Sequence, residues 1–295
     1  MATNITTSDA PDPRAAELAN ATTSHRQGNF VISTRKLPIS KAGPIEAMEK
    51  DLGIPVPEMI FGDNVMAVEH APSRWRLEFN ARNALDGVDK TGEQMLQVAH
   101  ASSWSASREQ TSAGIKEVVK PFDWSYTTTY KGTVIVSGGG AGEGQHNHER
   151  GPNWTGQFQP DDTPIPIELL KRRDPILFND EVVLYESELD DNGASVMTVK
   201  VRVHAQRMLL LCRLFMRLDN VVVRVRDTRV YVDFDSETVL REVTWKEGRF
   251  EDVKQRLLGR GIRPEGFAAA LRDSSQVAEI LPTVNMWKDS VMLMP

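Results

Sequence analysis

The stretch RLFMRLDNVVVRVRDTRVY, residues 213–231, decides the fold predicted for this chain. Two apolar or β-branched runs flank Asp219 and Asn220, and both of these residue types tolerate the positive φ of a tight hairpin turn. A helix over 207–218 is the alternative, because its apolar residues also fit a helical stripe. The three consecutive valines after the turn favour the strand, so we predict a β-hairpin.

A two-residue loop would pair Leu218 with Val221 and would place directly opposed side chains on the same face. One face would then be wholly apolar: Leu214, Met216, Leu218, Val221, Val223 and Val225. The other face would carry Arg213, Phe215, Arg217, Val222, Arg224 and Arg226. Guanidinium groups in such a row need carboxylates, which either this chain or a partner must supply.

Composition narrows the class of protein. A net charge of −6 over 295 residues argues against broad nucleic-acid binding, which normally shows a basic balance. The single cysteine, Cys212, rules out an internal disulfide framework, and its apolar surroundings predict an inert buried thiol. No signal peptide and no apolar run of about 20 residues is found. We therefore expect a soluble intracellular protein, cytoplasmic and also nuclear, with no membrane partner.

The pattern along the chain predicts one α+β domain at 30–295, with mainly antiparallel sheet and short helices near both ends. Residues 1–29 are poor in large apolar side chains and are expected to be a disordered tail. Residues 138–161, rich in Gly and His, are expected to be a flexible insert. The predicted strands are 30–32, 57–68 with a turn at 62–64, 74–79, 120–133, 181–186, 196–203 and 238–244. The predicted helices are 44–53, 81–88, 166–173, 250–259, 264–272 and 274–281. Gly53 is expected to end the first of them, and Asn80 is expected to cap the second.

Motifs for catalysis are sparse. The glycine run 138–144 lacks the lysine and hydroxyl residue of a phosphate loop. His146 and His148 lie two residues apart and would need further ligands to hold a metal. A metal-dependent hydrolase using this region is the alternative function, but a non-catalytic protein without cofactor or designed metal site is the prediction. Asp123, Trp124 and Tyr126, together with the arginines of the hairpin, instead suggest a recognition surface. The plainer interpretation is that the aromatic residues fill the core and the arginines pair internally.

Three dense motifs resemble a known family. They are PEMIFGDN at 57–64, KPFDWSYTT at 120–128 with YKGT at 130–133, and LFMRLDNV at 214–221 with RDTR at 226–229. In this order they resemble the TIPRL-type regulators of TOR signalling, and the resemblance runs from about residue 30 to 281. Departures are the longer N-terminal tail, the insert, a divergent C-terminal end, and Asn220 where glycine is usual. The insert puts in question how the surface near Ile165 is arranged.

The resemblance implies a mixed α+β fold without catalytic activity. It also implies binding to catalytic subunits of type 2A, 4 and 6 protein phosphatases, including their C-terminal tail, and a link to the Tap-type phosphatase-associated protein. The contact positions it implies are Asn83, where the family commonly has aspartate, Ile165, Val225 and Asp227. From the residues themselves we add that Arg226 or Arg229 could capture the carboxylate of the tail. Such a charge-assisted bond contributes about 1.5–3 kcal/mol.

Overall fold

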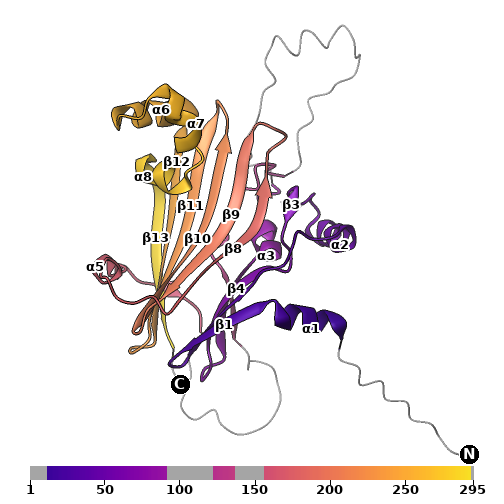
Figure 1. Cartoon of the computed structure of the whole chain (residues 1–295), viewed down its shortest axis with the longest axis vertical. Helices are drawn as coiled ribbons and strands as arrows, with labels where there is room; N and C mark the ends of the chain where they lie inside the picture. The colour runs from indigo at the N-terminus through magenta and orange to yellow at the C-terminus, as the bar shows by residue number, and fades with distance from the viewer. Residues whose placement is uncertain (1–11, 92–121, 137–155, 294–295) are drawn as a thin grey trace, which may run out of the picture.

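The computed structural model describes residues 12–91, 122–136 and 156–293. Two antiparallel sheets form its body (Figure 1), which confirms the predicted α+β class. In spatial order, the five-stranded sheet contains β1 (Thr22–Gln27), β2 (Phe30–Arg35), β4 (Val65–His70), β5 (Trp75–Asn80) and β6 (Thr133–Val136). The eight-stranded sheet contains β3 (Met59–Ile60), β8 (Phe178–Ser187), β9 (Gly193–Val203), β10 (Arg207–Leu218), β11 (Val222–Asp233), β12 (Thr238–Arg249), β13 (Thr283–Met292) and β7 (Gln159–Pro160).

The helices are short (Figure 1). Near the five-stranded sheet are α1 (Pro13–Asn20), α2 (Ala42–Leu52) and α3 (Ala81–Asp86). On the far side of the eight-stranded sheet are α5 (Ile167–Leu170), α6 (Phe250–Gly259), α7 (Phe267–Ala270) and α8 (Ser274–Ile280), with the 3₁₀ turn η1 (Pro264–Gly266) before α7. Among the described residues no helix is both long and apolar enough to span a membrane. We call the face of the eight-stranded sheet toward the five-stranded sheet the inner face, and the opposite one the outer face.

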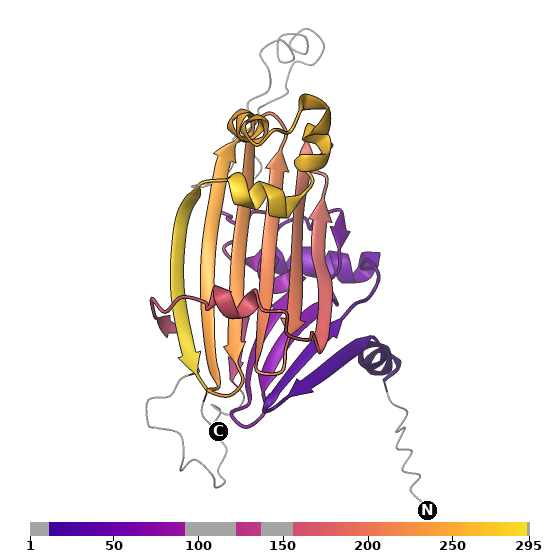
Figure 2. The same ribbon diagram turned by 60° about the vertical axis from the view of Figure 1, so that its left-hand side comes forward.

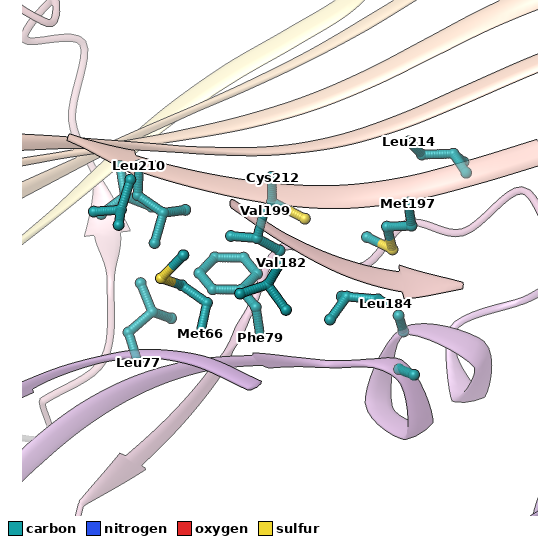
Figure 3. Close-up of a cluster of buried hydrophobic side chains, with 14 of the residues drawn as sticks. Met66, Leu77, Phe79, Val182, Leu184, Met197, Val199, Leu210, Cys212 and Leu214 are labelled. Atoms are coloured by element: carbon teal, nitrogen blue, oxygen red, sulfur yellow. The ribbon is translucent and has the colours of Figure 1, made fainter. Parts of the chain in front are cut away.

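The main core lies between the two sheets (Figure 3). Leu77 and Phe79 of β5 point toward Val199 of β9 and Leu210 of β10, and all four side chains are fully buried. Alternation along each strand sends every second side chain into this layer. Each fully buried side chain of this size stabilises the fold by roughly 1.5–3 kcal/mol.

The outer face of the eight-stranded sheet is also buried, in two separate places. At one end Phe215, Val223 and Val225 pack against α6, α7 and α8. At the other end Tyr231 and Leu240 pack against Ile165, which precedes α5. Because most residues of β10 are buried on both faces, its sequence reads as a nearly continuous apolar run rather than as a clean alternation.

The predicted hairpin is confirmed, but its predicted register is wrong by one residue. Leu218 lies opposite Val222, so the loop holds three residues, and Asn220 takes the left-handed conformation at φ +62°. A one-residue shift moves every side chain of β11 to the other face of the sheet. Arg224 and Arg226 therefore point to the inner face, whereas Arg213 and Arg217 of β10 point to the outer face. The single arginine row does not form.

Two further predictions need correction. The expected disordered tail over 1–29 contains α1 and β1, and β1 pairs along its whole length with β2. Asp12 caps α1 by accepting a hydrogen bond from the amide of Arg14, which gives this polar segment a local reason to fold. Within the predicted strand 120–133 the described part is a turn at 124–125 and irregular loop, and strand β6 begins only at Thr133.

The ends of two helices follow from local sequence signals. Helix α2 ends at Gly53 in the left-handed conformation, φ +70°, as a glycine stop predicts. Asn80 caps α3 by accepting a hydrogen bond from the amide of Asn83 at 2.8 Å. Residues 138–155 of the expected insert lie outside the described residues, while 159–160 form the short strand β7.

Candidate partner-binding site

A cluster of charged side chains occupies the middle of the outer face. The carboxylate of Asp227 accepts two hydrogen bonds from Arg213, at 2.7 and 2.8 Å, and one from Arg229 at 2.9 Å. Arg229 also donates to Glu242 at 3.4 Å. Arg213 in turn reaches the hydroxyl of Ser275 on α8 at 3.3 Å. The cluster therefore ties β10, β11 and β12 to the helical layer.

Exposure separates the members of this cluster. The side chain of Asp227 is only 1% exposed, whereas that of Arg229 is 27% exposed. Figure 2 shows that no helix covers the strands between α8 and α5. Arg229 belongs to the middle part of one of these strands, β11. Val225 is fully buried beneath α6–α8, and Ile165 is 5% exposed. Among the predicted contact residues on this face, only Arg229 offers a partly free polar group.

A second charged cluster lies on the inner face. Arg224 and Arg226 both donate to Glu247, at 2.7 and 2.9 Å, and Arg226 stacks on Trp245 at 5.0 Å. Burial alone would raise the pKa of Glu247, but the two arginines hold it below its usual value. Burial lowers the pKa of Arg226 despite its carboxylate partner. Thus Arg226 is internally paired and only 13% exposed.

The turn at 122–128 joins this inner cluster. Asp123 lies 3.8 Å from Arg224 and accepts hydrogen bonds from the backbone and the hydroxyl of Ser125. Burial raises its pKa. Tyr126, at φ +54°, is 8% exposed, and its carbonyl accepts a hydrogen bond from Tyr185. Trp124 packs against the main core. These residues are thus largely core residues, as the plainer interpretation of the sequence held.

Asn83 lies apart from both clusters, on α3 beside the five-stranded sheet. Its side-chain amide donates to the hydroxyl of Thr133 at 2.8 Å. A hollow of about 470 Å³ opens here, lined by Asn83, Asp86, Gly87, Thr129, Tyr130, Lys131, Gly132 and Thr133. The structure does not bring Asn83 together with Asp227. Helix α3, which carries Asn83, lies beside the five-stranded sheet, whereas β11, which carries Asp227, belongs to the eight-stranded sheet (Figure 1).

Several residues of these clusters were not predicted. Glu242, Glu247 and Trp245 belong to β12, and only the pairing of β12 with β11 shows that they meet the arginines. Strand β13 was not predicted at all, although the alternation around Met286 and Lys288 carries a strand signal. Within the described ranges, no group of three or more His, Cys, Asp or Glu residues is placed to hold a metal. His146 and His148 lie outside those ranges.

Comparison with known proteins gives a consistent result. Residues 59–254 match the TIP41-like family. A TIP41-like protein of Dictyostelium discoideum is 34% identical over 268 residues, which cover 90% of this chain and 91% of the relative. The type 2A phosphatase activator TIP41 of Saccharomyces cerevisiae is 36% identical, over 93% of this chain and 76% of the relative. The human TIP41-like protein is 38% identical over 78% of this chain and 79% of its own length. This chain belongs to the TIP41-like family.

Proposed function

We propose that this protein is a non-catalytic regulator that binds the catalytic subunit of type 2A-like Ser/Thr protein phosphatases and so modulates TOR-dependent signalling in the cytoplasm. Support for a phosphatase-regulating role comes from its relatives in two yeasts, which are named type 2A phosphatase activators. Type 4 and type 6 catalytic subunits are proposed as further partners, together with the Tap-type phosphatase-associated protein.

The observation that carries the binding mode is the partly exposed guanidinium of Arg229. It lies on an open part of the sheet face, held in place by the buried carboxylate of Asp227. A planar guanidinium fixed in this way is suited to a carboxylate. We place the C-terminal tail of the phosphatase across the outer face between α5 and α8, with its terminal carboxylate on Arg229. Arg226 is the weaker candidate, because it faces inward and is bonded to Glu247 and to the carbonyl of Lys246.

The burial of the other implied positions assigns them an indirect role. Val225, Asp227 and Ile165 are at most 5% exposed. Val225 packs within the sheet, Asp227 holds the guanidinium of Arg229, and Ile165 anchors the segment before α5, so each of them shapes the surface from beneath. Asn83, Asp123, Trp124 and Tyr126 lie toward the other sheet, so they belong to a second contact region or to the core rather than to the tail site.

The test is the affinity of the purified type 2A catalytic subunit, with and without its C-terminal tail, for wild type and Arg229→Ala. Loss of one charge-assisted bond lowers affinity about 10- to 100-fold for the intact subunit. The tail-less subunit should bind both proteins equally. Arg76→Ala is the matched control, because Arg76 is also a partly exposed arginine, 30% exposed, paired with a carboxylate, that of Glu78, but lies on β5 of the other sheet. Equal affinity of wild type and Arg229→Ala for the intact subunit would remove this site.

A further inference from the structure

Strand β13 forms an edge of the eight-stranded sheet along half of its length. It pairs with β12 from Thr283 onward, but on its other side it pairs with β7 only at Asp289 and Ser290. Within the residues described, nothing pairs with the outer side of 283–287. An edge of this kind presents unpaired backbone groups that a further strand can bond.

The direction of these backbone groups follows from the pairing with β7. The carbonyl of Lys288 accepts a hydrogen bond from the amide of Asp161 at 3.3 Å, so it points away from β12. In a strand, the backbone groups of every second residue point the same way. The N–H and C=O of Met286 therefore also point outward, beyond the end of β7.

Two usual protections against strand pairing, lysine and proline, are absent from residues 283–287. Residues 283–287, TVNMW, contain no charge and no proline. Val284 and Met286 are 59% and 54% exposed. Exposed edge strands are normally blunted by lysine, proline or a bulge that twists them away. A bulge is present at Val284, because Trp245 pairs with Asn285 and Lys246 pairs with Thr283. The regular part of the free edge therefore runs from Asn285 to Trp287, around Met286.

Two lysines flank the edge, one on each face. Lys131 lies over the ring of Trp287 at 5.7 Å, on the inner face. Lys288 lies on the outer face, in the same row as Glu242 and Arg229. In the described part of the chain neither lysine forms an ion pair. The carboxylate opposite Lys288, that of Glu242, pairs with Arg229 instead. Asp289, the only acidic residue of β13, forms an ion pair with Arg241.

We infer that the edge of β13 at 283–287 binds an extended, acidic segment of a partner protein by strand addition. Backbone hydrogen bonds to Met286 hold the segment, and its carboxylates meet Lys131 and Lys288 on the two faces. A second copy of this chain fits less well, since another β13 brings the same lysines and no free carboxylate. For the identity of the partner the inference rests on the proposed function, and the contact adds to the tail site on the outer face.

The test compares Met286→Pro with Met286→Thr in binding the type 2A catalytic subunit. Proline removes the outward N–H without removing a bond to β12, and an edge strand tolerates it there. Threonine keeps the N–H and is the matched control. We expect about a tenfold loss for proline and a smaller one for threonine. Lys131→Glu and Lys288→Glu should each weaken binding, whereas Lys50→Glu on the distant α2 should not.

Four results would overturn the inference. One is wild-type affinity of Met286→Pro. Another is a dimer of the free protein that Met286→Pro dissolves, which would make a second copy the occupant. A third concerns hydrogen exchange of the Met286 amide in the free protein. If this exchange is slow and becomes fast when residues 139–154 are deleted, a segment of this chain itself pairs with the edge of β13.

The fourth result applies if the wild-type protein does not bind the phosphatase. That failure would remove the proposed function, but strand addition at β13 could still be tested. A short peptide of alternating valine and glutamate then serves as the probe. It should protect the Met286 amide from exchange, while a valine–lysine peptide should not. Equal behaviour of the two peptides would refute strand addition.

Discussion

The buried carboxylate of Asp227 gives the sharpest test of the outer cluster. In Asp227→Asn the amide keeps the shape of the side chain but removes its charge, and Arg213 is left only 9% exposed without a carboxylate. Breaking a buried pair by removing one partner costs about 3–5 kcal/mol, and we expect about 3 kcal/mol because the amide oxygen still accepts one hydrogen bond. Arg229→Ala should cost only about 1 kcal/mol, since Arg229 is partly solvated and Asp227 retains Arg213.

Urea unfolding measures both changes. With an m value of about 3 kcal/mol/M, the midpoint should fall by about 1 M for Asp227→Asn and by about 0.3 M for Arg229→Ala. An unchanged m value is required for this comparison, because a changed m would mean an altered unfolded or native state. A larger loss in Arg229→Ala than in Asp227→Asn would refute the assignment of Asp227 as the buried anchor. Because the expected loss of stability is small, Arg229→Ala should remain folded, so its binding to the phosphatase can be measured on the native protein.

Three further predictions concern other parts of the fold. The folded pKa of Glu247 is lowered, so the stability that its carboxylate contributes is fully present above the unfolded pKa of about 4.5 and is lost as the pH falls through the folded pKa. In Glu247→Gln the urea midpoint should therefore change less between about pH 6 and pH 3 than in wild type. An equal dependence of the midpoint on pH in both proteins would contradict this. Gly193→Ala would place a Cβ 1.9 Å from the carbonyl oxygen of Arg217 and should lower the free energy of unfolding by about 3 kcal/mol, whereas Gly43→Ala, where the Cβ meets nothing, should not. Cys212 is 1% exposed and burial raises its pKa, so a thiol reagent should react with it only at the rate of unfolding, and fast labelling of the native protein would contradict its burial.

Much of the fold could be predicted from local chemistry. The cap at Asn80, the stop at Gly53 and the apolar runs on either side of Asp219 act within a few residues of themselves, so they carry the same meaning in the sequence as in the fold. The same holds for the helices after residue 249, where apolar spacing marks the side that packs on the sheet. The tail was misjudged because α1 and β1 are stabilised by a cap and by pairing with β2, which composition does not reveal.

The site depended on information that is not local. One extra residue in the hairpin loop decided which face each arginine of β11 occupies, and the sequence permits either register because both faces are apolar in places. The partners of the arginines come from β12, β13 and the 122–128 turn, and only strand pairing brings them together. The sequence by itself determined the fold class, the hairpin and the chemistry available at the surface. Only the tertiary structure decided that Arg229 remains partly exposed while Asp227 is buried, because burial depends on which elements pack over a strand rather than on the strand itself.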